Sequence, residues 1–209
     1  MTIMTNALIG AEQVQRAAFL QLFQNLNPAL VEMEDFMVTS DQAFSQITDR
    51  PYVATELEPV DPDNFHEGHT PSLIKAPIGE YPNCCVWVTR AAPAPGMEQY
   101  DHQTGWLDNL TVECMVKSET SEAEVDRRIK RMAEAVNVAL TSDPTLGGVV
   151  YELQTPPTVI WGDVFTRKER TAYGPHWFWQ GVRMEYPVRK EATMPTASGS
   201  FAGLDIDQG

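Results

Sequence analysis

Residues 121–150, SEAEVDRRIKRMAEAVNVALTSDPTLGGVV, carry the clearest folding signal in the chain. Ser121 with Glu124 three residues later forms a capping box, in which each side chain satisfies a backbone donor at the start of a helix. Apolar residues then recur at steps of four, three, four and four, which is the spacing of one face of an α-helix. They are Val125, Ile129, Met132, Val136 and Leu140. This pattern predicts an amphipathic helix over about 121–140 that packs on a sheet.

Gly147 and Gly148 follow this helix and raise the question of a phosphate-binding loop. Such a loop needs its glycines between a strand and the start of the next helix, where backbone N–H groups meet the anion. Here the order is helix, glycines, strand, and the end of a helix carries negative partial charge. Asp143 and Pro144 stop the helix, and the glycines supply positive φ for the return. We therefore interpret the pair as a turn into a strand.

Strand patterns lie on both sides of this unit. In LTVECMVKS (110–118) apolar residues alternate, so that Leu110, Val112, Cys114 and Val116 share one buried face. NCCVWVTRA (83–91) is mostly apolar and β-rich, which is typical of a buried strand. A long final strand is predicted over 176–192, and weaker strands over 149–154 and 158–165.

Residues 7–26 have a broad apolar stripe at helical spacing and predict a first helix. Pro28 is expected to end it or to begin a short second turn through Met33. The order of elements then predicts an α+β fold: a mostly antiparallel sheet with the N-terminal helix and the second helix packed on one face. The chain length fits a single domain over 1–192.

Residues 35–80 interrupt this regular pattern. They contain five prolines, which argue against long helices and central strands. We expect an acidic, Pro-rich excursion from the domain, with a short edge strand within 51–60 and a loop at 61–72. The small and polar residues of 193–209 predict a flexible C-terminal tail.

The charge balance restricts the classes of partner. The chain has 15 basic and 29 acidic residues, a net charge of −14, so its general surface will not hold nucleic-acid phosphates. A surface this acidic suits the lining of a passage through which DNA slides without binding. The N-terminus lacks the pattern of a signal peptide, and no apolar run has the length of a membrane span. Three cysteines, two of them adjacent, favour a reducing compartment.

The acidic loop at 61–69 is the first candidate for chemistry. Asp61, Asp63, His66, Glu67 and His69 are possible ligands for a divalent metal. Their spacing does not match a calcium loop, and no helix presents the two histidines together. We favour a solvated acidic loop and keep a metal-dependent enzyme as the more distant alternative.

Cys84 and Cys85 are the second candidate. Neighbouring strand residues point to opposite faces, so the two thiols cannot easily bind one metal or form a redox pair. A nucleophile formed with His102 or His176 has no support beyond composition. No fingerprint of a hydrolase, nucleotide-binding loop, zinc finger or dinucleotide fold is present. We expect no catalytic site and no cofactor.

The aromatic residues of the last strand predict a contact surface. Trp177 and Trp179 share one face and Phe178 takes the other, so both faces are apolar. One face meets the helices, and the other needs a cover, either the 35–80 excursion or a neighbouring subunit. Tryptophans favour interface centres, although plain core packing is the alternative. The residues proposed for a subunit interface are Trp177, Trp179, Trp161, Tyr173 and Arg183.

The segment 108–154, DNLTVECMVKSETSEAEVDRRIKRMAEAVNVALTSDPTLGGVVYELQ, resembles the tail terminator or tail-completion proteins of tailed bacteriophages. In that group a strand, a short acidic turn and an amphipathic helix are closed by a phrase much like AVNVALTSDPTLGGVV. YPNCCVWV (81–88), WGDVF (161–165) and WFWQGVRMEYPVRKE (177–191) match its other strands. The resemblance covers roughly 81–190 and, more loosely, the helix at 7–26.

The resemblance implies a structural role without catalysis. Such proteins form a ring, usually a hexamer, that caps the finished tail tube and joins it to the head–tail connector. The implied partners are copies of this chain, the major tail tube protein and a head-closure protein, with genomic DNA passing through the lumen. The implied location is the virion neck, after assembly in the host cytoplasm. A head-closure or adaptor protein of the same neck is the alternative, and the 35–80 and 193–209 segments look like additions to the family.

Overall fold

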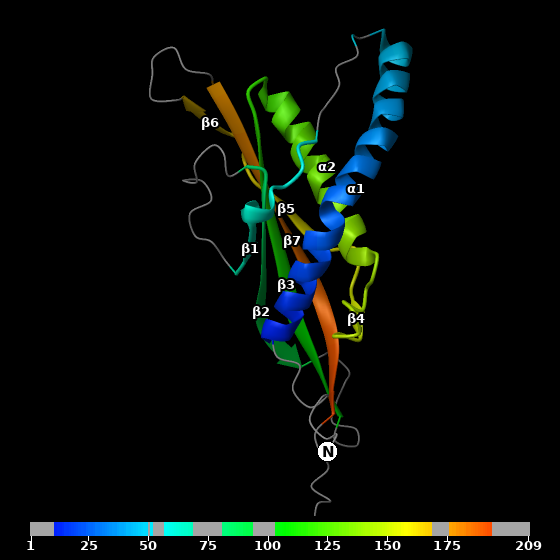
Figure 1. The fold of residues 1–209 in the computed structure, drawn as a ribbon, viewed down its shortest axis with the longest axis vertical. Coiled ribbons are helices and arrows are strands. Elements are labelled where there is room, and N and C mark those ends of the chain that lie inside the picture. Colours follow the sequence, from blue (N-terminus) through cyan, green and yellow to red (C-terminus); the bar gives the residue numbers. More distant parts are fainter. Residues whose placement is uncertain are drawn as a thin grey trace, which may run out of the picture.

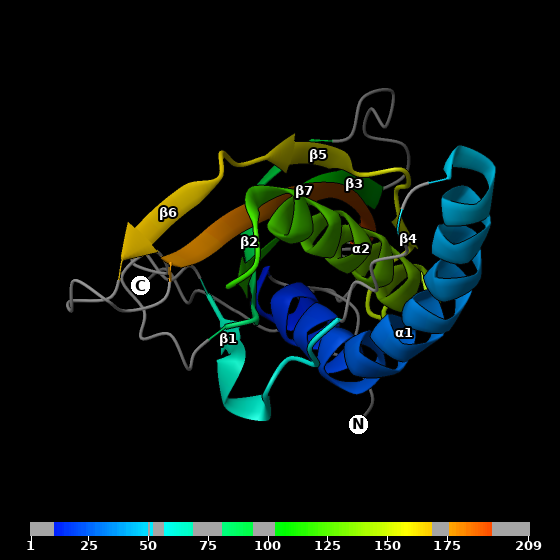
Figure 2. The same ribbon diagram turned by 90° about the horizontal axis from the view of Figure 1, so that it is seen from above.

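The protein has an α+β fold in which a seven-stranded sheet carries two long helices on one face (Figures 1 and 2). This computed structural model describes residues 11–49, 51, 57–68, 81–93, 103–168 and 176–193. The elements are α1 (Ala11–Thr48), a 3-10 turn (Pro62–Asn64), β1 (Phe65–Glu67), β2 (Asn83–Pro93), β3 (Gln103–Ser118), α2 (Glu122–Thr141), β4 (Glu152–Leu153), β5 (Thr158–Trp161), β6 (Phe165–Lys168) and β7 (His176–Thr193). The predicted fold class is confirmed.

The long strand β7 organises the sheet. One of its edges pairs with β3 along the whole of that strand, and its other edge pairs in turn with β4, β5 and β6. The strand order β1-β2-β3-β7-β4 is antiparallel except for β1 and β2, which are parallel. The face that carries Leu110, Val112, Cys114 and Val116 is buried, as the alternation predicts. In Figure 2 the sheet curls around α2, with α1 as the outer layer.

Helix α2 begins and packs as its sequence predicts. The hydroxyl of Ser121 accepts a hydrogen bond from the Glu124 backbone N–H at 3.1 Å, which caps the first turn. The Glu124 carboxylate forms ion pairs with Arg127 at 2.7 Å and with Arg128 at 3.1 Å. The apolar stripe lies against β3 and β7, and each of its five members is at most 2 % exposed: Val125, Ile129, Met132, Val136 and Leu140.

The glycine pair makes the turn that follows α2. Gly147 and Gly148 have φ of 70° and 80°, the left-handed region that glycine adopts without steric cost. The Asp143 carboxylate organises the turn, because it accepts hydrogen bonds from the Thr145 N–H at 3.0 Å and the Gly147 N–H at 2.8 Å. The chain then returns to the sheet, where the Tyr151 N–H donates to a β7 carbonyl. The interpretation of this stretch as a turn is confirmed.

The Asp143 turn gives a pH-dependent prediction. The hydroxyl of Thr145 and the backbone donors of Gly147 and Thr145 hold the pKa of Asp143 below its ordinary value of 3.8. The stabilisation is therefore present above that pH and is lost as pH falls through the lower folded pKa. Asp143→Asn should lower the Tm at pH 7, and the gap to the parent should narrow below about pH 4. Thermal melts across pH check this, with the exposed Asp163→Asn as control.

The weaker strand predictions are only partly right. The strand expected over 149–154 is reduced to β4, and the strand expected over 158–165 is divided into β5 and β6. Pro156 and Pro157 separate β4 from β5, because a proline has no N–H to donate to the β7 ladder. The final strand and the strand at 83–91 are present, each with slightly longer bounds.

The prediction that Pro28 ends the first helix is wrong, since α1 continues to Thr48 over 38 residues. Leu26, Ala29 and Leu30 lie on both sides of the proline and are all buried on one stripe. The Asn27 amide also exchanges two hydrogen bonds of 2.9 Å with the Val60 backbone. These contacts outweigh the roughly 3 kcal/mol that an interior proline costs a helix. The expected excursion therefore begins as helix, and residues 7–10 lie outside the described part.

The loop expected at 61–72 is also replaced in part by regular structure. Asp61 accepts a hydrogen bond from the Asp63 N–H and caps the 3-10 turn, and β1 then joins the sheet beside β2. Phe65 is buried, because its ring packs on Phe19 and Phe23 of α1. The sheet therefore has an additional edge strand, which the prolines of this region led us to predict as a loop. Residues 52–56, 69–80 and the tail at 194–209 lie outside the described residues.

A buried glutamine of α1 caps the end of α2. The Gln21 amide nitrogen lies 3.1, 2.7 and 3.1 Å from the carbonyl oxygens of Ala139, Leu140 and Asp143. These carbonyls belong to the last turn of α2 and the start of the glycine turn, where no further backbone N–H of the helix is present to donate to them. The contact therefore joins the two helices at the point where α2 turns back to the sheet.

Removal of this cap should destabilise the fold. Gln21→Ala leaves buried carbonyl groups without their donor, so we expect a loss of about 1–3 kcal/mol in unfolding free energy. Gln24→Ala, on the exposed side of the same helix, is the matched control and should change stability by less than about 0.5 kcal/mol. Urea unfolding measures both. Equal effects of the two substitutions would mean that Gln21 does not act as a cap.

Candidate subunit interface

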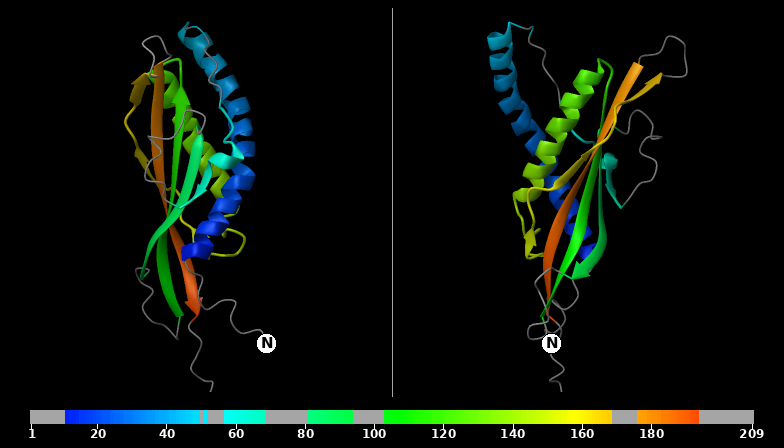
Figure 3. Two further views of the ribbon diagram at one scale, coloured as in Figure 1. Left: turned by 60° about the vertical axis from the view of Figure 1, so that its left-hand side comes forward. Right: turned by 180° about the vertical axis from the view of Figure 1, so that it is seen from behind.

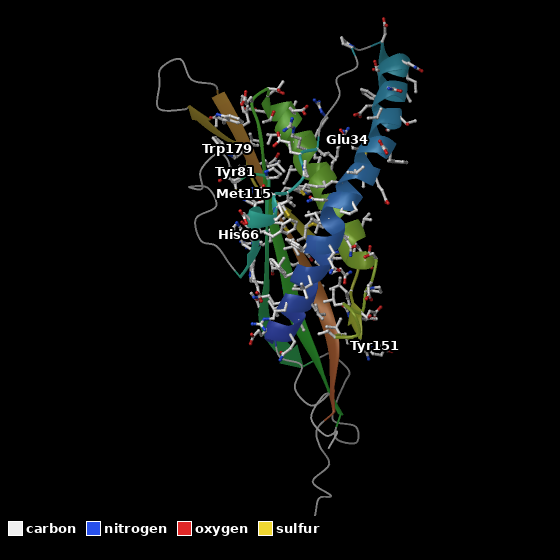
Figure 4. The ribbon with its side chains drawn as sticks, in the orientation of Figure 1. Glu34, His66, Tyr81, Met115, Tyr151 and Trp179 are labelled. Atoms are coloured by element: carbon white, nitrogen blue, oxygen red, sulfur yellow. The ribbon has the colours of Figure 1, made fainter. Side chains whose placement is uncertain are left out.

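The sheet face that points away from the helices carries a second apolar cluster, here called the aromatic face. Its buried members are Tyr81, Cys85, Met115 and Trp179, against which Trp87 and Trp177 are half-buried. Figure 4 shows Tyr81, Met115 and Trp179 close together beside the sheet. The period of two along β2, β3 and β7 produces this cluster, because residues next to core positions point to the opposite side.

Charged side chains lie over the rings of the aromatic face. Arg183 forms an ion pair with Glu113 at 3.1 Å, and its guanidinium lies 5.7 Å from the centre of the Trp87 ring. The ammonium of Lys117 lies 5.3 Å from the centre of the Trp177 ring. Arginine and tryptophan are the residue types most often found at the energetic centres of interfaces. The surface therefore combines apolar area with cations in fixed positions.

A shallow groove of about 290 Å³ lies where β5 meets β7 on this face. The Gly162 N–H donates to the Gly181 carbonyl at 2.9 Å, and a Cβ at Gly162 would lie 3.1 Å from that oxygen. Glycine at this position permits the close approach of the two backbones. Ile160 lines the groove and is 48 % exposed, beside Arg183. An apolar side chain so exposed next to an arginine suits contact with another protein.

Two buried donors of the aromatic face have no hydrogen-bond partner among the described residues. They are the indole N–H groups of Trp177 and Trp179. A buried indole N–H usually finds an acceptor, since an unpaired donor costs about 1–3 kcal/mol.

The structure places the five predicted interface residues differently. Trp177, Trp179 and Arg183 lie together on the aromatic face. Trp161 lies on the opposite side of β5 from Ile160 and lines a separate groove with α1 and α2. Tyr173 lies outside the described residues. We did not predict Trp87, although Trp87 is three residues from Cys84 in the predicted strand and therefore lies on the opposite face. We also did not predict Ile160, because the face on which Ile160 lies depends on the register of β5.

The loop at 61–69 does not bring metal ligands together in its described part. Asp61 caps the 3-10 turn, His66 is half-buried in β1, and Glu67 lies 3.5 Å from Arg16. His69 lies outside the described residues. No group of three or more histidine, cysteine, aspartate or glutamate side chains in the described ranges is arranged to hold a metal ion.

The three cysteines are free thiols inside the protein. Cys84 faces the helices and Cys85 faces the aromatic cluster, which confirms that they point to opposite sides. A hydrogen bond with Cys84, together with burial, raises the pKa of the Cys114 thiol well above its ordinary value. Such a thiol stays protonated at neutral pH and is a poor nucleophile. His102 and the side chain of His176 lie outside the described part.

Comparison with models of known protein families finds no match, and a search of curated protein sequences also finds none. Neither of the two described helices is both long and apolar enough to cross a membrane. The aromatic face and the groove beside Trp161 are two surfaces that the described residues offer to a partner.

Proposed function

We propose that this chain is a subunit of a tail terminator ring, which caps the tail tube of a tailed bacteriophage and joins it to the head–tail connector. The observation that carries this proposal is the unit 108–154. The sequence that resembles the family forms a strand, a short acidic turn, a capped helix and a glycine turn back to the sheet. The conformation of this unit agrees with what the resemblance implies.

The partly exposed residues of the aromatic face support a role in assembly. Self-association into a closed ring requires that one surface of a subunit meet a different surface of the next. The aromatic face offers tryptophan, arginine and an exposed isoleucine over a rigid sheet. These residue types are enriched at the centres of interfaces. We assign this face to the contact between neighbouring copies in a ring, which is usually a hexamer in the family that the sequence resembles.

The overall charge supports a ring around DNA. A net charge of −14 gives the chain a field that repels phosphate, so DNA can pass through a lumen without being held. The remaining partners in this proposal are the major tail tube protein on one side of the ring and a head-closure protein on the other. The chain acts in the virion neck, carries no cofactor and catalyses no reaction.

Assembly on tail tubes tests this function. The purified chain would be examined by mass photometry and negative-stain electron microscopy, alone and with tail tubes purified from particles that lack it. We expect a closed ring at one end of each tube. Tubes are included because the subunits of such rings can remain monomeric until they meet the tube. Binding to isolated connectors but not to tubes would instead assign the chain to head closure. A monomer that binds neither structure would refute a role in the neck.

A further inference from the structure

The second half of α1 carries an apolar stripe that the fold leaves open. Beyond Leu30 the stripe continues at steps of three and four residues on the core-facing side of the helix. Figure 3 shows that this half of α1 leans away from α2. Phe36 is 69 % exposed and Ile47 is 84 % exposed, although both lie on the side that faces the core nearer the N-terminus. The stripe comprises Met33, Phe36, Met37, Phe44 and Ile47.

A groove of about 450 Å³ lies between this half of α1, the start of α2 and β5. Apolar walls come from Met37 and from Trp161, whose side chain is half-exposed, and the rest of the lining is charged. A volume in this range holds two or three apolar side chains of a bound segment. The residues that line it are Met37, Arg127, Lys130, Arg131, Glu134 and Trp161.

Three cations and one carboxylate line this groove on a strongly acidic protein. Arg131 pairs with Asp41 of α1 at 2.5 Å and fixes the spacing of the two helices. Lys130 pairs with Asp126 at 2.6 Å, but its side chain is 58 % exposed. An exposed pair of this kind contributes little to stability, so its cation can take a new carboxylate without a large loss. The groove therefore suits a segment with apolar and acidic residues.

The sequence after β7 has this chemistry. Residues 194–209, MPTASGSFAGLDIDQG, contain Phe201, Leu204 and Ile206 with two aspartates and no basic residue. Of the terminal segments outside the described residues, the other, 1–10, carries no charged side chain. We infer that residues 201–207 of one copy bind the groove between α1 and α2 of a neighbouring copy, with apolar side chains between Met37 and Trp161 and aspartates at Lys130 and Arg127.

Chain length favours a neighbouring copy over the same copy. Trp161 pairs with Val182, which is eleven residues from the end of β7 at Thr193, about 36 Å along the strand. Phe201 is eight residues beyond Thr193 and reaches about 27 Å at full extension. Phe201 therefore falls short of its own groove, and Leu204 and Ile206 reach that far only if the chain after Thr193 is almost fully extended. The groove of a neighbour sets no such limit, and each copy then offers one segment and one groove, as a closed ring requires.

Disulfide mapping in the full chain tests this contact. The three native cysteines are buried, so introduced cysteines report on the groove. Met37→Cys and Leu204→Cys chains, mixed under mild oxidation, should give a covalent dimer at least tenfold faster than Val138→Cys mixed with Leu204→Cys. Val138 is exposed on α2 outside the groove lining, which makes it the matched control. Lys130→Glu in the Met37→Cys chain should slow dimer formation several-fold.

Two results would overturn the inference. One is equal rates for the groove pair and the control pair. The other is an intrachain disulfide as the main product of the Met37→Cys/Leu204→Cys double variant, which would place the segment in its own groove. The inference does not depend on the tail-capping role, because the mapping uses purified chain alone. Failure of the crosslink leaves the ring proposal standing, and failure to bind tubes leaves the crosslink result unchanged.

Discussion

Ile160→Glu is expected to abolish ring assembly while leaving the monomer folded. Ile160 is nearly half exposed and lies on the aromatic face beside the Arg183–Glu113 pair. Loss of an apolar contact at an interface centre costs at least about 2 kcal/mol, or roughly 30-fold in the dissociation constant. A carboxylate at this position would also have to be desolvated when copies associate, and a closed ring incurs the loss at every contact. The total loss in assembly should therefore exceed 100-fold.

Val138→Glu is the control for this substitution. Val138 is 43 % exposed on α2, so it has similar exposure and receives the same charge away from the aromatic face. Mass photometry in the presence of tail tubes measures assembly, and circular dichroism shows whether each variant is folded. If Ile160→Glu formed rings as well as Val138→Glu, the aromatic face would not be the subunit contact.

Ile129→Ala is expected to destabilise the fold strongly. Ile129 is fully buried at the centre of the α2 stripe, where the helix packs on β3 and β7. Removal of its branched side chain loses transfer free energy and leaves a cavity, which together cost about 2–5 kcal/mol. Because whole domains are stable by only about 5–15 kcal/mol, this is a large fraction of the total.

Urea unfolding of Ile129→Ala and Val138→Ala separates core packing from helix propensity. Both positions lie on α2, and both substitutions introduce alanine, but Val138 is partly exposed. Val138→Ala should change the unfolding free energy by no more than about 0.5 kcal/mol. A similar loss for both variants would show that the α2 stripe does not form the core of the fold.

The sequence predicts α2 and its neighbouring strands well because several local signals agree there. Capping by Ser121, apolar spacing along the helix and positive φ at Gly147 all indicate the same boundaries. The alternation in β3 likewise determines which side chains face the helices. Where local chemistry and packing favour the same conformation, single-sequence patterns are sufficient.

The sequence fails where tertiary contacts override local preference. By helix propensity alone, Pro28 should break the helix. The hydrogen bonds that hold the helix together beside it join Asn27 to Val60, more than thirty residues away. A distant partner also determines β1. This strand lies within the expected excursion and forms because it pairs with β2, almost twenty residues further along the chain. Patterns within a short window contain no information about such partners.

The candidate interface was predictable only in part. The placement of Trp177 and Trp179 on one face follows from strand alternation, and Arg183 was predicted with them. The structure adds Trp87, because β2 and β7 lie on either side of β3. Trp161 was assigned to the same surface, but it lies on the side of β5 that faces α2. Its position depends on the register of β5 on β7, which no local pattern specifies.

The position of the chain on intact particles tests the central claim most directly. Purified bacteriophage particles would be labelled with a gold-conjugated antibody against this chain and examined by electron microscopy. The ring proposal predicts label at one site on each particle, where the tail tube meets the head, and unlabelled tubes of uncontrolled length in lysates that lack the chain. Absence of the chain from particles, with tails that assemble to normal length without it, would contradict the proposal.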